Sequence, residues 1–506
     1  MRRCLAEPRG LHERVLNPIF SAGTNRYTRL TAFWGNHLAS NDSLRRLATV
    51  TVPAPNLSPQ SFLNHANGEP RGFWARDERW VAHRGVILSL GAEDVVDGDR
   101  FAKTASAARE IAQSVLLPDR AVGDSRSRFY GGFSFRSDHQ PSGVWADFPG
   151  SVFHLPAIEL EGDDSGDVWL RVRALVNTDA GGRVFHHLRA QAESLRVELG
   201  SRADFSRIPE RVSGFALATE RGNWEAAVDS SLDAVRAGLI SKAVLARTMD
   251  VDLQEGVIDP VDVVARLWEM NRGSHVFLFE PVAGSAIVGA APETVATLRD
   301  GDFHATAVAG SIRRGNSPRE QAELAAQLLA SDKDRSEQKI ALDDMVAQLK
   351  TVGSHIHVDS QPHVLTLARI QHLETEIRAS VPSSLGILDL VRLLHPTAAV
   401  CGLPRDAAMA FLEREEPFER GWYAGPVGWF DPEGNGVFAP ALRMGVSTGS
   451  GWRLFAGAGI VEGSVPALEW EETSIKFEPM LDALRAAGAE LRQNNVGQTT
   501  GVRRKK

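Results

Sequence analysis

Four charged residues in the C-terminal part of the chain are of types that could do chemistry together. Lys242 lies in SKAVLAR, Glu293 in GAAPET, Glu337 in SDKDRSEQ and Glu472 in EWEETSIK. A neutral lysine can deprotonate water, and a carboxylic acid that keeps its proton can act as a general acid. Two carboxylates without Cys or His nearby form a hard oxygen site that suits Mg²⁺, and Glu469, three residues before Glu472 on the same helical face, could ligate through water.

Each of these residues also has an ordinary structural explanation. Acidic residues in the first turn of a helix, where we place Glu337, stabilise the helix dipole by about 0.3–1 kcal/mol. Glu472 and Lys476 form a common i,i+4 pair. A lysine at the start of a strand is usually solvated, and a Glu after Pro is usually polar surface. Only the surrounding motifs favour the chemical interpretation.

Residues that could hold an anion lie near these motifs. Arg443 offers a bidentate fork for a carboxylate, and Tyr423 in WYAGPVG is a second candidate. The segment 456–463, AGAGIVEG, contains GxGxxxG, but Pro466 and the two residues before it interrupt the helix that a dinucleotide loop requires. We therefore interpret this segment as a strand whose glycines let the backbone approach an anion closely.

The composition argues against nucleic-acid and membrane partners. Hydrophobic residues are 43% of 506, so the core can be large without a metal or disulfide staple. The net charge of −8 is not that of a basic nucleic-acid-binding surface. No run approaches about 18 apolar residues, so no transmembrane helix is expected, nor is a signal peptide. The two cysteines, Cys4 and Cys401, exclude a disulfide framework and a zinc site built on Cys pairs, and they suit the cytoplasm.

The periodicity of the sequence favours an α+β fold with a large, mostly antiparallel sheet. Alternating patterns such as WLRVRALV at 169–176 predict strands, which are mixed with helices without strict βαβ order. Ser317 as N-cap, followed by Pro318 and by Glu320 at the third helical position, marks a helix start. Helices are expected at 102–117, 184–197, 222–238, 261–271 and 468–485, and after Ser317 and Ser331.

Taken together, the motifs resemble those of the chorismate-binding enzymes, the family of anthranilate synthase component I. The resemblance rests on KAVLAR, GAAPET, AVAGSIRRG, SDKDRSEQ, HPTAAVCGLP, YAGPVGW, ALR, AGAGIV and EWEETSIK, which match in order and spacing. FYGGFSF and WADFPGSVFHLP look, less closely, like the sheet-forming half of the family. The resemblance implies a large two-sheet β-sandwich flanked by helices, the fold of aminodeoxychorismate synthase.

The resemblance also divides the chain. We expect a poorly ordered N-terminal extension at 1–45 and the N-terminal part of the sheet fold at 46–204. The chorismate-binding catalytic region is expected at 205–486, after a linker around 198–214. A disordered basic tail is expected at 487–506.

Within the family, three positions discriminate between reactions. Members that use ammonia typically carry Gln where this chain has Lys242, and aminodeoxychorismate synthases carry a nucleophilic Lys where this chain has Ala309. Water is therefore the implied nucleophile. Salicylate synthases are the closer rival, because they share the Lys and the acid; their pocket usually has a Thr where this chain has Ala399-Val400. The segment HPTAAVCG looks like that of isochorismate synthases.

The resemblance implies a Mg²⁺-dependent isochorismate synthase, an isomerase that adds water at C2 of chorismate and removes the C4 hydroxyl. Lys242 would activate water and Glu293 would protonate the departing hydroxyl. Glu337 and Glu472, with Glu469 close by, would hold Mg²⁺. The implied substrate contacts are Gly310, Ser311, His372, Ala399, Val400, Tyr423, Arg443, Gly457, Ala458 and Lys476.

Two other functions stay open at this point. One is a salicylate synthase, and the other is a catalytically silent chorismate-binding subunit, which would be expected to lack the Lys or a catalytic carboxylate. The isochorismate product would serve menaquinone or siderophore biosynthesis. We expect a monomer in the cytoplasm, with chorismate as its small-molecule substrate.

Overall fold

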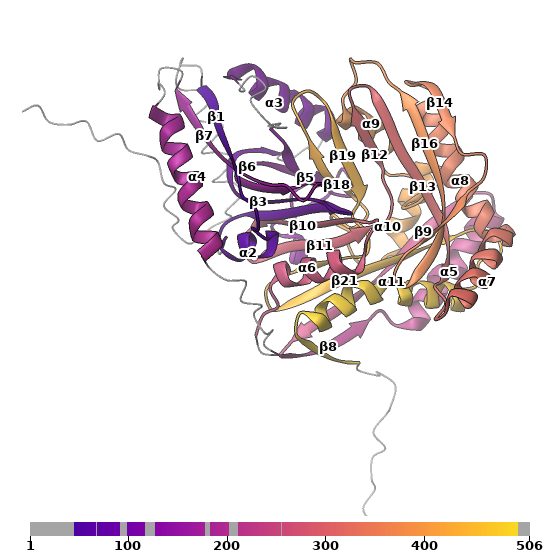
Figure 1. The fold of residues 1–506 in the computed structure, drawn as a ribbon. Helices are drawn as coiled ribbons and strands as arrows, with labels where there is room; N and C mark the ends of the chain where they lie inside the picture. The colour runs from indigo at the N-terminus through magenta and orange to yellow at the C-terminus, as the bar shows by residue number, and fades with distance from the viewer. Residues whose placement is uncertain are drawn as a thin grey trace, which may run out of the picture. The chain divides into compact units, whose positions relative to one another are not determined.

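A computed structural model describes residues 45–66, 68–91, 99–116, 127–177, 183–201, 211–254 and 256–493 (Figure 1). All of them belong to one compact unit, Ser43–Lys506. The expectations for residues 1–44 and 494–506 fall outside the described residues.

Helices and strands alternate irregularly along the described chain, as the α+β class requires. The α-helices are α2 (Pro59–Asn64), α3 (Arg100–Ser114), α4 (Arg183–Ser201), α5 (Arg221–Arg236), α6 (Pro260–Met270), α7 (Pro318–Ala330), α8 (Asp332–Leu349), α9 (Ile387–Leu394), α10 (Arg405–Glu415) and α11 (Pro466–Ala486). The strands are β1 (Arg45–Pro53), β2 (Arg71–Arg76), β3 (Arg79–Gly91), β4 (Val115–Leu116), β5 (Phe129–Phe133), β6 (Ser151–Gly162), β7 (Val168–Asn177), β8 (Val212–Ala218), β9 (Lys242–Leu253), β10 (His275–Val282), β11 (Ser285–Ala291), β12 (Ala296–Arg299), β13 (Asp302–Arg313), β14 (Ser354–Val358), β15 (His363–Thr366), β16 (Ile370–Ser380), β17 (Gly402–Leu403), β18 (Pro426–Phe430), β19 (Gly436–Pro440), β20 (Met444–Ser447), β21 (Gly451–Ile460) and β22 (Ala489–Gln493).

The strands form one continuous hydrogen-bonded network. Pairing runs in the order β16-β13-β12-β19-β18-β5-β6-β3-β2-β10-β11-β20-β21-β9-β8-β22. Within the described part of the chain, only β1 with β4 and β8 with β22 pair in parallel. The α+β class with a large, mostly antiparallel sheet flanked by helices is confirmed. The two sheets that the resemblance implied are joined by strand pairing into one hydrogen-bonded network. Strands from both sides of position 205 pair with each other, as β2 does with β10.

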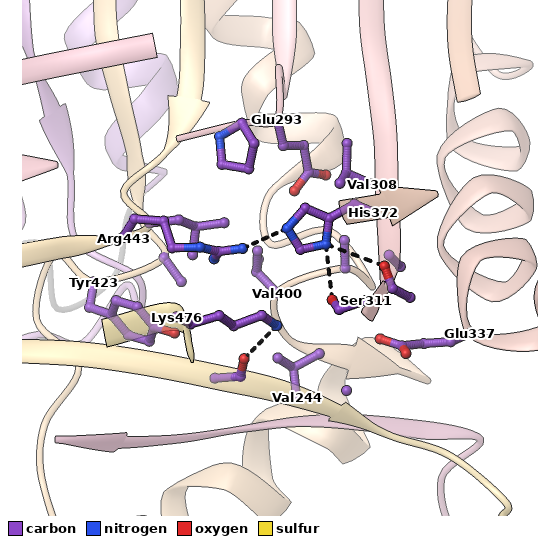
Figure 2. A pocket seen from close by; sticks show the side chains of 18 residues that line it. Val244, Glu293, Val308, Ser311, Glu337, His372, Val400, Tyr423, Arg443 and Lys476 are labelled. Atoms are coloured by element: carbon purple, nitrogen blue, oxygen red, sulfur yellow. Dashed lines mark hydrogen bonds between the residues drawn. The ribbon is translucent and has the colours of Figure 1, made fainter. Parts of the chain in front are cut away.

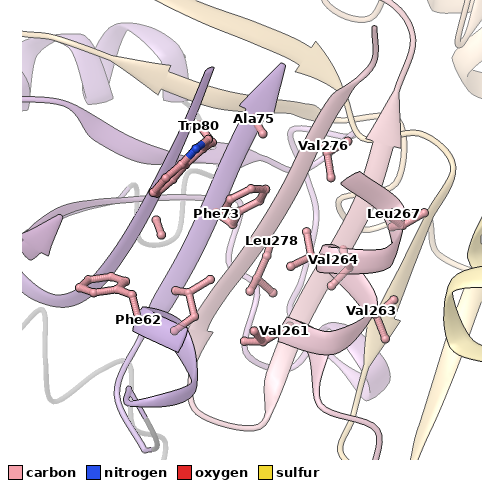
Figure 3. Close-up of a cluster of buried hydrophobic side chains, with 14 of the residues drawn as sticks. Phe62, Phe73, Ala75, Trp80, Val261, Val263, Val264, Leu267, Val276 and Leu278 are labelled. Carbon is pink, nitrogen blue, oxygen red and sulfur yellow. The ribbon is translucent and has the colours of Figure 1, made fainter. Parts of the chain in front are cut away.

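Two clusters of buried side chains fill the space between the sheet and the helices. In the first, α2 and α6 cover β2, β3 and β10, and Figure 3 shows Phe62, Phe73, Trp80, Val264 and Leu278 meeting there. The second cluster packs α3, α8 and α9 against the strands that include β12, β13 and β16. Because α8 belongs to this second core, its position relative to β13 is fixed by packing.

The helix starts that the sequence predicted are present. The Ser317 hydroxyl accepts a hydrogen bond from the Glu320 N–H, and Ser331 caps α8 in the same way through the N–H of Asp334. Glu337 falls in the second turn of α8, one turn later than expected, because α8 begins at Asp332.

The chain after α11 differs from the expected disordered tail. Residues Ala489–Gln493 form β22, which pairs in parallel with β8 and so covers an edge of that strand. An unpaired strand edge leaves a row of backbone N–H and C=O groups without partners, which is a reason for the chain to continue pairing here. The mixed polar sequence of this segment gave no such signal.

Helix α11 is held against β9 by one buried cation. Arg247 on β9 is 2% exposed, and its guanidinium lies 3.7 Å from the centroid of the Trp470 ring. It donates hydrogen bonds to the hydroxyls of Thr473 (2.8 Å) and Ser474 (2.7 Å). Burial lowers the pKa of Arg247 to about 9. Arg247 therefore fixes the turn of α11 that carries Glu472.

We predict that Arg247→Ala lowers the free energy of unfolding by about 3 kcal/mol, because it leaves a cavity and breaks a buried network. Arg247→Met should cost less than half as much, since its side chain fills most of the space without a buried charge. Urea unfolding of the three proteins measures both values. An Ala variant as stable as the parent would contradict the anchoring role of Arg247.

Candidate active site

A cavity opens where β9, β13, β16, β21, α8 and α11 meet (Figure 2). It contains about 540 Å³ of space not filled by protein atoms, part of it open to solvent. Its lining consists of Val244, Pro292, Glu293, Val308, Ala309, Gly310, Ser311, Glu337, His372, Ala399, Val400, Tyr423, Ala424, Leu442, Arg443, Gly457, Gly459 and Lys476.

Most of the residues singled out in the sequence line this cavity, although they come from segments far apart in the chain. Lys242, Glu469 and Glu472 lie just outside the lining. Lys242 contacts Glu337 and Glu472 contacts Lys476, both of which line the cavity, and Glu469 contacts Lys333. Ala458 is fully buried on β21 between Gly457 and Gly459, both of which line the cavity.

Lys242 is the first residue of β9, and its amine is enclosed. The side chain is 0% exposed, and Nζ has no hydrogen-bond partner among the described residues. Its nearest opposite charge is Oε1 of Glu337, 3.3 Å away. Gly459, on the paired strand β21, makes room for this contact: a Cβ there would lie 2.0 Å from Oε1 of Glu337 and 2.9 Å from Cε of Lys242. Only glycine at 459 lets the two charged groups meet without displacement.

Glu293 follows β11 and lines the cavity, and Figure 2 shows His372 and Ser311 between it and Glu337. It is 2% exposed, and one carboxyl oxygen has no hydrogen-bond partner in the part of the chain that the structure describes. Burial raises the pKa of Glu293 to about 8, with a further increase from Glu374, while Lys242 and Arg443 oppose the change. Glu293 therefore keeps its proton near pH 7 and can donate it.

A chain of hydrogen bonds runs from Arg443 through His372 to Ser311, as Figure 2 shows, and on to Glu472. Arg443 can only donate, so at 2.9 Å the Nε2 atom of His372 accepts and Nδ1 carries the ring proton. Burial and the charge of Arg443 lower the pKa of His372 well below its ordinary value, so the ring is neutral. Nδ1 lies 3.2 Å from the Gly310 carbonyl oxygen and 2.9 Å from the Ser311 hydroxyl. Because that hydroxyl accepts from His372, its own proton is free for Glu472, with which it forms a hydrogen bond.

Tyr423, Arg443 and Lys476 form the cationic and polar side of the cavity. The Tyr423 ring stacks on Phe455 at 5.0 Å between centroids, and burial raises the pKa of Tyr423 to about 12, so its hydroxyl stays a donor. Lys476 donates to the Gly457 carbonyl oxygen at 2.9 Å and to Glu472 at 2.6 Å. Two non-glycine residues of the wall, Ala424 and Arg443, have positive φ angles of 62° and 47°, a costly conformation that tends to occur at functional sites.

Glu337 of α8 lines the cavity, and Glu469 and Glu472 of α11 lie close to it. Burial alone would raise the pKa of Glu337, but Lys242 and Lys333 outweigh it and lower the pKa. For Glu472, burial is likewise outweighed by Lys476 and Lys333, and the pKa is lowered. Burial and the neighbouring Glu472 raise the pKa of Glu469 to about 7. Two ionised carboxylates and a third that titrates near neutrality form an oxygen-rich site of the kind Mg²⁺ prefers.

No ready-made metal cage is present in the described parts of the chain: no three or more His, Cys, Asp and Glu side chains are arranged to hold an ion there. The ammonium of Lys333 lies among the carboxylates, 3.2 Å from Oε1 of Glu469 and 3.4 Å from Oε2 of Glu337. The donor set fits Mg²⁺ in charge and atom type, and a cationic side chain stands in the space between the donors.

Sequence reasoning missed Lys333 and Glu374. Lys333 belongs to the motif SDKDRSEQ that pointed to Glu337, and its i,i+4 spacing from Glu337 was a usable signal. Glu374 lies two positions beyond His372 on β16, opposite Val308 of β13, and is hydrogen-bonded to His363 at 3.0 Å. Its influence on Glu293 depends on strand register, which the sequence did not provide.

We predict that Glu293→Gln makes the protein more stable at high pH. A carboxyl whose pKa is raised on folding contributes stability at low pH that is lost as pH rises through the folded value of about 8. The stability gain of the Gln variant over the parent should therefore grow from pH 5 to pH 9, by on the order of 4 kcal/mol at most. Urea unfolding at pH 5, 7 and 9 measures it, with the exposed Glu269→Gln as the control for a lost negative charge. A gain that does not change with pH would contradict the raised pKa.

Comparisons with known proteins agree with this architecture. The family profile described as chorismate binding enzyme matches residues 34–485. The chain is 36% identical over 418 residues to the salicylate biosynthesis isochorismate synthase of Pseudomonas aeruginosa, across 82% of this chain and 85% of that protein. It is 31% identical over 466 residues to the isochorismate synthase MenF of Bacillus subtilis, across 88% of this chain and 95% of that protein. Among solved structures, MenF, the menaquinone-specific isochorismate synthase from Escherichia coli, shares the fold with a TM-score of 0.71 at 23% identity, over 91% of this chain and 99% of that one. The chain belongs to the chorismate-binding enzymes.

Proposed function

We propose that this protein is an isochorismate synthase, which converts chorismate to isochorismate by adding water at C2 and removing the C4 hydroxyl. The observation that carries the proposal is that one cavity brings together a carboxyl group that keeps its proton, Glu293, and an enclosed amine that can accept a proton, Lys242. Glu293 holds a proton on one side, because burial raises its pKa to about 8. Lys242 is enclosed next to Glu337, and no described residue forms a hydrogen bond with its amine. The names of the relatives from Pseudomonas aeruginosa and Bacillus subtilis support the same reaction.

In this mechanism the chain moves two protons. Lys242, once it has given up its own proton, takes a proton from water as the oxygen attacks C2 of the ring. Glu293 gives its proton to the oxygen that leaves C4, so that water rather than hydroxide departs. One water enters and one water leaves, and the product is an isomer of chorismate. Between turnovers Lys242 returns its proton to solvent and Glu293 regains one.

Chorismate carries two carboxylates, and the cavity offers a separate set of donors for each. Arg443, the Tyr423 hydroxyl and the backbone at Gly457 and Ala458 are assigned to the enolpyruvyl carboxylate. Lys476 is close to the ring carboxylate. The remaining assigned contacts of the ring are Gly310, Ser311, His372, Ala399 and Val400.

Glu337 and Glu472 are the proposed Mg²⁺ ligands, and Glu469 would bind the ion through water. A bound Mg²⁺ would neutralise the ring carboxylate and so allow an anionic substrate to approach a group of buried glutamates. The hydrogen bond from Ser311 and the ion pair with Lys476 orient the Glu472 carboxylate for this role.

Among the described residues, no helix combines the length and apolar character needed to cross a bilayer. We propose that the protein is a monomer. We also propose that it works in the cytoplasm, because its two cysteines suit a reducing compartment. Menaquinone and siderophore biosynthesis remain the two candidate pathways for its product.

We predict that the purified protein, given chorismate and Mg²⁺, forms a product of the same mass as chorismate, with or without ammonium. Lys242→Ala should lower turnover by about 100-fold or more, since general-base catalysis contributes about that much, while the exposed Lys350→Ala should not. Liquid chromatography with mass spectrometry identifies the product. Salicylate plus pyruvate would move the assignment to a salicylate synthase. Chorismate binding without any product would favour a silent chorismate-binding subunit.

We predict that Glu472→Gln raises the Mg²⁺ concentration for half-maximal activity at least about tenfold, because even outer partners of metal ligands typically change affinity by about 10–100-fold. Glu471→Gln is the matched control, since Glu471 is the preceding residue of α11 and is exposed. A magnesium titration of initial rates measures the shift. Equal titration curves for Glu472→Gln and the parent would contradict its assignment as a ligand.

A further inference from the structure

Lys333 occupies an unusual place for a lysine. It lies in the first turn of α8, where the helix dipole favours negative charge and disfavours a cation. Its side chain is only 23% exposed. Its ammonium is 3.2 Å from Glu469, 3.4 Å from Glu337 and 3.7 Å from Asp334. The carboxylates, which come from both α8 and α11, must therefore hold it in place.

The carboxylates in turn depend on this cation. Glu337 and Glu469 lie on different helices, and Lys333 is the cation that contacts both of them. Lys242 contacts Glu337 only at Oε1, and Lys476 pairs with Glu472. Without Lys333, like charges on α8 and α11 would face each other across a buried interface, which destabilises both.

The side chain of Lys333 can move away from the carboxylates more easily than those of Lys242 and Lys476. Lys242 is 0% exposed, and Lys476 is 10% exposed and is held by both Glu472 and the Gly457 carbonyl oxygen. The side chain of Lys333 reaches solvent and has four rotatable bonds. It can withdraw without breaking the backbone contacts of α8.

We propose that Lys333 is a built-in counter-cation, which holds the carboxylates of Glu337 and Glu469 together in the metal-free protein and withdraws toward solvent when Mg²⁺ binds. The inference rests on the proposed function in one respect, namely that these carboxylates bind Mg²⁺. Both cations need the same oxygens, since Lys333 contacts Oε2 of Glu337 and Oε1 of Glu469. Mg²⁺ requires oxygen ligands at about 2.0–2.1 Å, so an ammonium cannot remain between them.

Two consequences follow for the enzyme. The free protein binds Mg²⁺ more weakly than its carboxylates alone would, because binding must first displace an ion-paired side chain. The cavity wall also keeps its shape when the metal leaves, because α8 and α11 stay connected through Lys333. Lys333 is thus a positioning residue that sets the metal affinity of the free enzyme.

The test is calorimetric titration of Mg²⁺ into the full-length protein without chorismate, comparing the parent with Lys333→Met. We expect Lys333→Met to bind Mg²⁺ about fivefold more tightly or better, the lower end of typical coupling between two ligands. Its melting temperature without metal should fall below that of the parent and be restored by saturating Mg²⁺. Lys339→Met is the matched control, because Lys339 lies on the same helix and its ion pair with Asp343 is exposed; it should change neither quantity.

Equal or weaker Mg²⁺ binding by Lys333→Met would overturn the role of Lys333. Absence of Mg²⁺ binding in both the parent and the variant would instead overturn the magnesium site itself, and with it the proposed metal dependence. If Lys333→Met does not fold, Lys333→Gln, which keeps a similar length and a donor, replaces it in the titration. Crystal structures of the parent with and without Mg²⁺ give an independent readout: the distance from Nζ of Lys333 to Glu469 should exceed 4 Å, the limit of an ion pair, only with the metal bound. A distance unchanged by Mg²⁺ would overturn the proposal.

Discussion

The site depends on a balance of buried charge between α8, α11 and β9. Glu337, Glu469 and Glu472 are removed from water together, which is costly unless cations compensate them closely. Lys242 comes from the sheet, and Lys476 from α11 itself. The packing of α8 in its core and the attachment of α11 through Arg247 therefore matter for chemistry, because a small shift of either helix would leave one of these charges unpaired.

The carboxyl group of Glu293, in the same cavity, is not compensated by a neighbouring cation in the described part of the chain. Glu293 is buried like the other glutamates, but no cation lies within ion-pairing distance of it among the described residues, and Glu374 adds negative charge nearby. Burial therefore decides its protonation, whereas cations decide that of Glu337 and Glu472. Four glutamates of one chain thus divide into a proton donor and a group that binds cations, which is how pKa environments separate the roles of identical side chains.

Local patterns in the sequence predicted much of the fold, and the resemblance of its motifs to a known family indicated most residues of the cavity wall. Ser317 and Ser331 begin helices where expected, because a cap is a property of a few adjacent residues. The resemblance of the motifs to a known family is what selected Lys242 and Glu293 from many similar residues. The pairing of β8 with β22 and the place of Glu374 opposite Val308 depend on which strands meet and in which register. No local pattern encodes that information, so these features had to come from the structure.

The hydrogen-bond chain across the cavity links its two ends. Arg443 can only donate, and this fixes the proton of His372 on Nδ1; the Ser311 hydroxyl then accepts from His372 and has its own proton free for Glu472. Each bond in this chain has one permitted direction, with the donors on the Arg443 side and the acceptors on the Glu472 side. A hydroxyl at 311 is needed to accept and donate at once, and a serine satisfies this as well as a threonine would. The network therefore joins the Arg443 guanidinium to the Glu472 carboxylate through two uncharged side chains, His372 and Ser311.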